Sequence, residues 1–431
     1  MISAPASGQG KTSVTVALAR KLVRAGQRVR VFKTGADFLD PLMLEQSCGY
    51  PVYVLDLWMV GVAQCRQLLH GAAQEADVVL VEGVMGLYDG TPSSADLARE
   101  FGLPVLAVID VRAMAQTIGA VAVGLRDFGP VSLAGVIANG VAGPGHARLL
   151  REALGSIPLM AQLPRLPDAL PERHLGLVLP AEVANLDALI GTLADSLMID
   201  AEQWERLGHT ELQEPATPPS PGAEPARDKL PLAGKVIAIA RDAAFAFVYP
   251  ANVNCLQRLG ATIRVFSPLA DEPVPASASG LWLPGGYPEL HGERLCNALR
   301  FQRSLKDAHE AQLPILAECG GMMVVTDAML DTDERRWPMA GLLPGVTRMH
   351  AGLKAIGLQG WRMAQGELRG HTFHHSSLAS PIDETARTIC HPSGNQGECI
   401  YQLGSLTASY FHAYFDSCPA AVSALFGGAA H

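Results

Sequence analysis

The chain has 431 residues, which is too long for one hydrophobic core and long enough for two large or about three average domains. Its 33 Lys and Arg residues against 42 Asp and Glu residues leave a formal net charge of −9, which argues against a nucleic-acid partner. Apolar residues make up 48% of the chain, yet no uncharged stretch is long and continuous enough to span a membrane, so we expect the excess in buried strands and alanine-rich helices.

The first half of the chain alternates short apolar runs with helical patterns. Strands are predicted at residues 29–32, 78–81, 105–109 and 133–137, and helices at residues 12–25 and 114–128. The second half repeats the pattern, with strands predicted at residues 236–240, 262–266, 280–283 and 315–317. Continuous apolar runs separated by helices predict parallel strands that are buried on both faces. Both halves are therefore expected to be doubly wound α/β domains with mainly parallel sheets and with function at the carboxyl ends of the strands.

A proline-rich segment divides the two halves. Six prolines interrupt a polar stretch at residues 214–231, which is typical of an extended linker. We therefore predict a first domain at residues 1–208, a linker at 209–232 and a second domain at 233–431. The eight cysteines have no metal-binding or disulfide spacing and no leader precedes the first motif, which indicates a cytoplasmic protein. Only Met1, Ile2 and Ser3 form a strand before that motif, so the true start codon is expected further upstream.

The first motif is a phosphate-binding loop at residues 7–12, between a very short apolar start and a predicted helix. The backbone N–H groups of a loop containing Gly8 and Gly10 can surround phosphates, Lys11 can reach the terminal phosphates, and the Thr12 hydroxyl can bind Mg²⁺. The match is incomplete, because Pro5 stands where the P-loop pattern has its first glycine. A glycine-rich strand-to-helix turn without a nucleotide is the alternative.

Acidic residues follow the neighbouring strands of the first half. Glu82 ends a buried strand, which is the position expected of a carboxylate that holds Mg²⁺ or its water. Lys33, Asp37 and Asp40 follow another strand, and Asp89 lies beyond Glu82. Any one of these residues could be a simple capping or turn residue. Together, at strand ends in a P-loop domain, they favour nucleotide and metal binding.

A candidate thiol nucleophile lies in the second half. Cys319 ends a strand and is followed by two glycines and a helical pattern, as in a nucleophile elbow, and the helix N-terminus is expected to lower the pKa of the thiol. Backbone N–H groups at Gly320, and at Gly286 in a second Gly-Gly turn, are suited to stabilising an oxyanion. His412 follows a late apolar run and is the candidate base.

Three further histidines, His371, His374 and His375, cluster in the second half and are potential metal ligands. No carboxylate or cysteine stands at ligand spacing beside them. Contact with an anionic substrate is therefore the favoured interpretation.

The combination of these motifs resembles the cobyrinic or hydrogenobyrinic acid a,c-diamide synthases of cobalamin biosynthesis over nearly the whole chain. The resemblance is carried by residues 5–12, 32–41, 81–90, 170–177, 283–290 and 317–321. It implies a P-loop NTPase-like amide synthase domain similar to dethiobiotin synthetase, followed by a flavodoxin-like class I glutamine amidotransferase domain. The implied substrates are ATP, glutamine and a corrinoid polycarboxylate, and the implied cofactor is Mg²⁺. A homodimer is compatible with the resemblance.

The resemblance also implies residue roles. Cys319 would attack the glutamine amide, His412 would move the proton, and the released ammonia would displace phosphate from an acyl phosphate made with ATP. Four acids match family positions that bind Mg²⁺ or activate the carboxylate, namely Asp37, Asp40, Glu82 and Asp89. Asn139 stands where a related asparagine contacts adenine. Many triad amidotransferases have a glutamate two residues after the histidine, but this chain has Tyr414, so a Cys-His dyad is predicted.

Three alternatives stay open. Cobyric acid synthase amidates other carboxylates of the same ring, although residues 170–177 favour the a,c enzymes. A ParA/MinD-like ATPase switch would carry a lysine five residues before the P-loop lysine, where this chain has Ala6. A binding module with an inactive amidotransferase domain would show no glutaminase activity.

Overall fold

The computed structural model describes residues 1–166, 172–173, 176–214 and 230–427. The chain forms two compact units, Met1–Pro219 and Ser220–His431. Most of the predicted linker lies outside the described residues. In the string at residues 170–177 that resembles the family, only the backbone of residues 172–173 and 176–177 is described. Among the described residues, no helix combines the length and the apolar character needed to cross a membrane.

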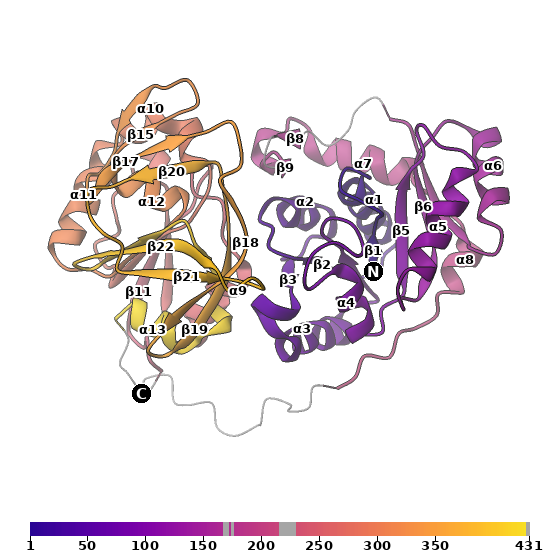
Figure 1. Cartoon of the computed structure of the whole chain (residues 1–431), viewed down its shortest axis with the longest axis horizontal. Coiled ribbons are helices and arrows are strands. Elements are labelled where there is room, and N and C mark those ends of the chain that lie inside the picture. The colour runs from indigo at the N-terminus through magenta and orange to yellow at the C-terminus, as the bar shows by residue number, and fades with distance from the viewer. Residues whose placement is uncertain (167–171, 174–175, 215–229, 428–431) are drawn as a thin grey trace. The chain divides into compact units, whose positions relative to one another are not determined.

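The first unit is built on an eight-stranded sheet in its described part, with strand order β10-β7-β6-β5-β1-β4-β2-β3 (Figure 1). All neighbouring strands are parallel except β10, which runs antiparallel to β7. Its strands are β1 (Ile2–Ser3), β2 (Val29–Thr34), β3 (Tyr53–Leu55), β4 (Val78–Glu82), β5 (Val105–Asp110), β6 (Leu133–Val141), β7 (Leu159–Pro164) and β10 (Met198–Ile199). A separate pair is β8 (Glu172–Arg173) with β9 (Gly176–Leu177).

Helices cover both faces of this sheet. They are α1 (Lys11–Arg24), α2 (Leu39–Cys48), α3 (Val62–Glu75), α4 (Ser94–Glu100), α5 (Thr117–Asp127), α6 (Pro144–Leu154), α7 (Leu186–Ser196) and α8 (Ala201–Glu205). On β5, Leu106 and Val108 pack with α1, α2 and α7, whereas Ala107 and Ile109 pack with α4, α5 and α6. Because both faces of one strand are buried, its sequence is continuously apolar, and the prediction of a doubly wound parallel sheet is confirmed.

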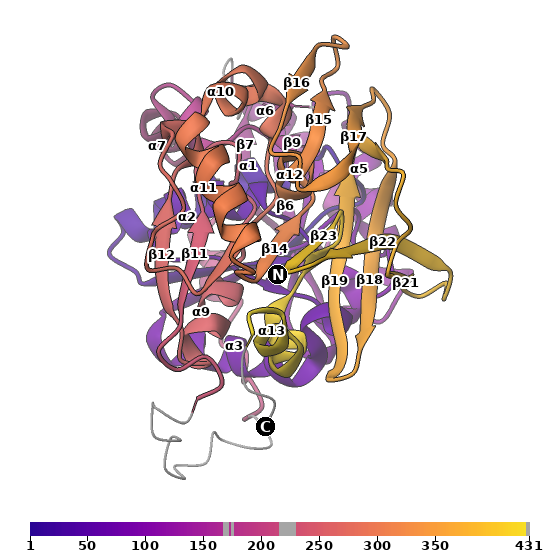
Figure 2. The same ribbon diagram turned by 90° about the vertical axis from the view of Figure 1, so that its left-hand side faces the viewer.

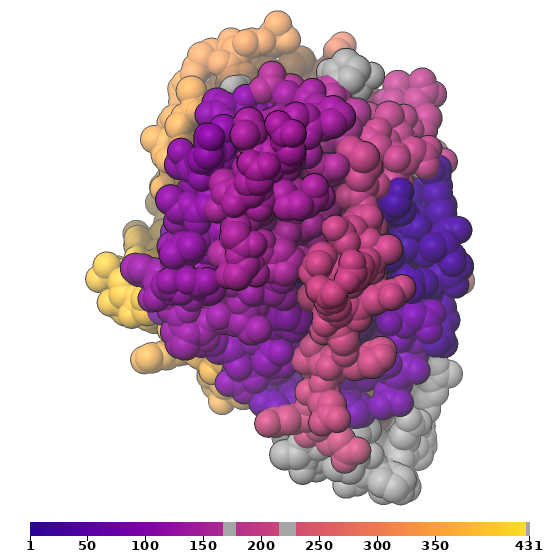
Figure 3. Space-filling model, turned by 90° about the vertical axis from the view of Figure 1, so that its right-hand side faces the viewer, coloured from indigo at the N-terminus to yellow at the C-terminus, as the bar shows by residue number. Residues whose placement is uncertain are grey.

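Helix α8 and the segment that follows it also pack on the first unit. Trp204 and Leu207 lie against its core, and Arg66 donates a hydrogen bond to Gln213 at 2.7 Å. Figure 3 shows the chain near residue 200 running between the α5–α6 region and the N-terminal segments. Contacts of the first unit therefore extend five residues beyond its predicted end at residue 208.

The second unit contains a ten-stranded sheet in its described part, with order β12-β11-β13-β14-β23-β22-β21-β18-β19-β24 (Figure 2). The neighbours from β12 to β23 are parallel, and those from β23 to β24 are antiparallel. Its strands are β11 (Val236–Ala240), β12 (Thr262–Phe266), β13 (Gly280–Leu283), β14 (Ile315–Glu318), β18 (Ala355–Met363), β19 (Gly366–His374), β21 (Ala386–Cys390), β22 (Gln396–Leu403), β23 (Leu406–Ser409) and β24 (His412–Ala413).

A smaller mixed sheet and five helices complete the described part of the second unit. The small sheet contains β16 (Arg336–Pro338), β15 (Thr326–Leu330), β17 (Leu343–Met349) and β20 (Ser376–Ala379). The helices are α9 (Pro250–Arg258), α10 (Gly292–Asn297), α11 (Leu299–Glu310), α12 (Gly320–Val325) and α13 (Pro419–Leu425). The core on one face includes residues of α10, α11 and α12, and the core on the other includes residues of α9 and α13.

Candidate active sites

The P-loop connects β1 to α1 at the carboxyl edge of the first sheet. Gly8 and Gly10 have φ values of 75° and 81°, which side-chain-bearing residues rarely adopt. A Cβ atom at Gly10 would collide with the Asn139 side chain from β6. The Asn139 amide donates a hydrogen bond from Nδ2 to the Gln9 carbonyl oxygen at 3.0 Å. In this structure Asn139 therefore braces the P-loop backbone.

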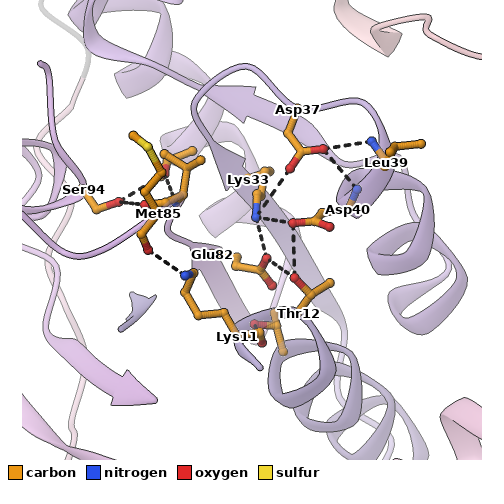
Figure 4. A network of polar contacts seen from close by, with 12 residues as sticks. Lys11, Thr12, Lys33, Asp37, Leu39, Asp40, Glu82, Met85 and Ser94 are labelled. Carbon is orange, nitrogen blue, oxygen red and sulfur yellow. Dashed lines mark hydrogen bonds and ion pairs between the residues drawn. The ribbon is translucent and has the colours of Figure 1, made fainter. Parts of the chain in front are cut away.

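Lys11 begins α1 and is buried beneath the loop that follows β4. Its Nζ donates to the Met85 carbonyl oxygen at 2.6 Å and to the Ala6 carbonyl oxygen at 3.3 Å (Figure 4). Burial, followed by the nearby Lys33 ammonium, lowers the pKa of Lys11. Asp89, on the same loop as Met85, accepts a hydrogen bond from the Gly86 N–H at 2.9 Å and so shapes that loop.

A buried cluster of charges lies next to Lys11, between the ends of β2, β4 and α1. The Lys33 Nζ lies 2.6 Å from both Asp40 Oδ2 and Glu82 Oε1, and 3.7 Å from Asp37 Oδ2 (Figure 4). The Thr12 hydroxyl donates to the same two oxygens of Glu82 and Asp40, at 2.9 and 3.2 Å. The structure thus brings together five of the residues that the sequence assigned to one site.

The electrostatics of this cluster follow from burial and close opposite charges. Burial opposes the charge of Lys33, but the carboxylates of Asp40, Glu82 and Asp37 outweigh it and raise the pKa of Lys33. Burial, together with the neighbouring Asp40, raises the pKa of Asp37 to about 7. Burial would raise the pKa of Asp40 as well, but its bond to Lys33 lowers it. The lysine therefore favours the ionised form of Asp40.

Cys319 occupies the turn between β14 and α12, with a φ of 47°. Its N–H donates to the Ser409 carbonyl oxygen of β23 at 2.7 Å. A Cβ atom at Gly320 would lie 3.0 Å from the Gly286 nitrogen, so the two Gly-Gly turns lie directly against each other. This is the arrangement expected of a nucleophile elbow with backbone N–H groups on two sides.

The expectation that helix α12 lowers the pKa of the thiol is wrong in this structure. Burial, and next the nearby Glu289 carboxylate, raises the pKa of Cys319 instead. The helix has only six residues, and its end is buried with the sulfur. Removing the thiol from water disfavours the thiolate more than the helix favours it. The resting group is a neutral thiol, which needs a base to become a nucleophile.

His412 lies in β24 beside the Gly285–Gly286 turn. A Cβ atom at Gly285 would collide with its imidazole ring. The ring stacks on His371, with 5.0 Å between centroids and 17° between planes. Burial lowers the pKa of His412 well below its usual value, so the ring is neutral and able to accept a proton at neutral pH.

The histidine cluster of the sequence divides into separate environments. His371 Nε2 lies 2.9 Å from the Tyr249 hydroxyl, and burial lowers the pKa of His371 to about 3. His374 pairs with Glu398 at 3.0 Å and stacks on Tyr410 at 3.8 Å. Among the described residues, no group of three or more His, Cys, Asp or Glu side chains is arranged to hold a metal ion. The metal-ligand interpretation of these histidines therefore has no support.

Glu318 is a buried residue of this site to which the sequence interpretation gave no role. It accepts hydrogen bonds from the Trp282 indole N–H at 2.8 Å and from the Ala413 N–H at 2.9 Å. Burial raises the pKa of Glu318 to about 7. The signal in the sequence was a carboxylic acid closing an otherwise apolar strand, directly before the candidate nucleophile.

The buried His371 is expected to make the fold sensitive to acid. Its pKa is about 3 in the folded chain and about 6.5 when unfolded, so between these values only the unfolded chain binds the proton. Stability should therefore fall as the pH drops below about 6.5, by at most about 1.4 kcal/mol per pH unit from this group. His371→Asn should reduce that slope in urea unfolding between pH 7.5 and 5, whereas His209→Asn, at an exposed position, should not. Equal slopes in all three proteins would contradict the prediction.

Comparisons with known proteins identify both halves of the chain. Residues 1–178 match the family model of the CobQ/CobB/MinD/ParA nucleotide binding domain, and residues 236–420 match that of the CobB/CobQ-like glutamine amidotransferase domain. The chain is 54% identical to a cobyrinate a,c-diamide synthase of Herminiimonas arsenicoxydans, over 99% of this chain and 96% of the relative. It is 49% identical to a hydrogenobyrinate a,c-diamide synthase of Pseudomonas aeruginosa, over the same shares of the two chains. A third relative, the hydrogenobyrinate a,c-diamide synthase of Stutzerimonas stutzeri, is 52% identical over 99% of this chain and 97% of its own length. This chain therefore belongs to the family of cobyrinate and hydrogenobyrinate a,c-diamide synthases.

Proposed function

We propose that this chain uses ATP and glutamine to convert the a and c acetate carboxylates of cobyrinate or hydrogenobyrinate into amides. Each round consumes one carboxylate, ATP, glutamine and water, and yields one amide, ADP, phosphate and glutamate. The observation that carries the proposal is the end-to-end similarity to a,c-diamide synthases at 54% identity. The nucleotide-binding and glutamine amidotransferase domains that this reaction needs are both present.

In the second unit, the Cys319 sulfur would attack the carboxamide carbon of glutamine while His412 takes the thiol proton. The histidine would return this proton to the departing ammonia, and water would then release glutamate from the thioester. The N–H groups of Gly286 and Gly320 would stabilise the oxyanion. Their roles are supported by the close approach of the two Gly-Gly turns and by the neutral state that burial imposes on both the thiol and the imidazole.

In the first unit, Lys11 and the N–H groups of the loop containing Gly8 and Gly10 would bind the ATP phosphates. Lys33 would neutralise the phosphoryl group being transferred, and Asp40 and Asp89 would take part in activating the substrate carboxylate. Asn139, which donates a hydrogen bond to the Gln9 carbonyl oxygen, would contact the adenine. These roles are supported by the convergence of the side chains at one sheet edge.

The residues present fit a Mg²⁺ ion that arrives with ATP. The Glu82 Oε2 atom is buried and has no hydrogen-bond partner in the described part of the chain, and the Thr12 hydroxyl lies beside the other oxygen of the same carboxylate. Mg²⁺ in proteins uses one or two such groups and completes its shell with phosphate oxygens and water. Thr12 and Glu82, with Asp37 nearby, would hold it, and bound there it would neutralise phosphate charge.

Compartment and assembly are further proposals. All eight cysteines are free thiols, which supports a reducing cytoplasm. A homodimer is a prediction that sedimentation velocity can test.

The proposed function is tested by mass spectrometry of the ring substrate. Cobyrinic acid and hydrogenobyrinic acid are each incubated with the protein, ATP, Mg²⁺ and glutamine. A mass change corresponding to two amidations is expected for at least one of them, and none without ATP or without Mg²⁺. An unchanged mass in both complete mixtures would contradict the function, and amidation without Mg²⁺ would contradict the metal role.

A further inference from the structure

The strand that carries the nucleophile ends in a buried carboxylic acid. Glu318 closes β14, directly before Cys319, and only 3% of its surface is exposed. The three strand residues before it are the apolar Ile315, Leu316 and Ala317. A carboxyl group in such a place is costly unless both of its oxygens have hydrogen-bond partners.

The two oxygens of Glu318 bind groups on two different strands. Oε2 accepts the indole N–H of Trp282, on the neighbouring strand β13, at 2.8 Å. Oε1 accepts the backbone N–H of Ala413, on β24, at 2.9 Å. Both partners are hydrogen-bond donors, and the ionised carboxylate is the protonation state of Glu318 that accepts at both oxygens. One side chain thereby connects the nucleophile strand to the residue that follows His412.

The segment after His412 also has hydrogen bonds to parts of the unit other than β14. Asn252 of α9 donates from Nδ2 to the Ala413 carbonyl oxygen at 2.8 Å and accepts the Phe415 N–H at 2.8 Å. The Tyr414 N–H donates to the Arg369 carbonyl oxygen at 2.8 Å. These contacts attach the segment to α9 and β19. The bond to Glu318 attaches the same segment to the strand that leads to the thiol.

We propose that Glu318 is a positioning residue of the glutaminase site, which sets the distance between the Cys319 turn and the His412 imidazole through the backbone of Ala413. This inference rests on the proposed roles of Cys319 and His412 in hydrolysing glutamine. The Glu318 carboxyl binds the N–H groups of Trp282 and Ala413, so its proposed role is to position the reacting groups and not to react. Proton transfer between a thiol and an imidazole depends steeply on their separation, so a small displacement of β24 is enough to slow it.

The test uses glutamate release in the complete reaction mixture by the full-length chain. In Glu318→Gln, one amide oxygen can still accept a hydrogen bond, but the amide NH₂ then faces either the Ala413 N–H or the Trp282 N–H. We expect kcat for glutamine hydrolysis to fall by about 10- to 100-fold. The KM for glutamine should stay within about twofold, because the substrate-contacting groups are intact. Amidation with added ammonia in place of glutamine should be retained, which shows that the chain is folded.

A second pair of variants separates hydrogen bonding from charge. Trp282→Phe removes the donor to Oε2 and leaves the bond to Ala413, so this variant should keep most of the glutaminase activity. In the double variant Glu318→Gln/Trp282→Phe, the amide oxygen can accept the Ala413 N–H with no opposing donor at the other position. Its kcat should recover to within about fivefold of Trp282→Phe, since the connection to Ala413 is restored without a charge.

The outcomes distinguish this inference from the proposed function. Wild-type kcat in Glu318→Gln would overturn the positioning role and leave the function intact. An equal loss in the single and double variants would also overturn it, because the charge and not the connection to Ala413 would then matter. A rise in KM alone would assign Glu318 to glutamine binding instead. Absence of glutaminase activity in the wild-type protein would instead contradict the proposed function itself.

Discussion

Replacing Cys319 by alanine is expected to abolish amidation supported by glutamine and to leave amidation supported by ammonia intact. The thiol is the proposed nucleophile that releases ammonia, so its loss should reduce glutamine-dependent synthesis at least about a thousandfold. Added ammonia bypasses this step, because the P-loop site belongs to the other compact unit. Liquid chromatography of the ring amides, with either nitrogen donor, measures both activities in one preparation.

Cys296→Ala is the matched control for this experiment. Cys296 is another free thiol of the second unit, on α10, and is partly buried, whereas Cys319 is buried. It should amidate with both nitrogen donors at close to the wild-type rate. Retention of glutamine-dependent synthesis in Cys319→Ala would remove Cys319 from the mechanism, and loss of both activities would indicate a folding defect.

Replacing Lys11 by methionine should produce the complementary pattern. Amidation should fall by about 100-fold or more with either nitrogen donor, because the variant loses a cationic group that is proposed to stabilise the transferring phosphate. Methionine keeps the length and much of the apolar stem of lysine while removing the ammonium that Met85 and Ala6 hold in place. The proposed glutaminase groups lie in the second unit, so glutamine hydrolysis should remain measurable.

Lys21→Met provides the control, since Lys21 lies on the same helix and donates to the Ala194 carbonyl oxygen outside the P-loop site. It should amidate at close to the wild-type rate. The Lys11 prediction would be contradicted by ammonia-dependent amidation within a few fold of wild type in Lys11→Met. Comparison of the activities of the Cys319 and Lys11 variants assigns ammonia release to the second unit and ATP-dependent amidation to the first.

The strands predicted at the centres of the two sheets were correct, because the feature that identifies such a strand lies within its own sequence. A strand buried between two helical layers must be apolar at every position, as in β5, and such a run is visible in the sequence alone. The strand-end positions of Glu82 and Cys319 follow from the same patterns. Function at the carboxyl ends of parallel strands then groups the P-loop, Lys33 and Glu82 before any contact is known.

The antiparallel half of the second sheet was not predicted, because its strands are only partly buried. In β18, exposed residues such as Gly357 and half-buried ones such as Leu358 stand among buried ones, and neither a continuous apolar run nor strict alternation results. The charge state of Cys319 could not be predicted from the neighbouring residues in the sequence either. The thiol is buried within a core that is assembled from segments far apart in the chain, from Ala238 to Tyr410. Their combined desolvation reverses the effect inferred from the adjacent helix.

The backbone of Cys319 has a thermodynamic consequence. Its φ of 47° lies in a region where a Cβ atom crowds the main chain, and glycine would adopt it freely. A cysteine there costs the folded chain roughly 1–3 kcal/mol relative to an unstrained residue. Stability alone would favour glycine at this position, so the proposed nucleophile stands against the preference of its own backbone. Position 319 is therefore a place where this fold trades conformational stability for reactivity.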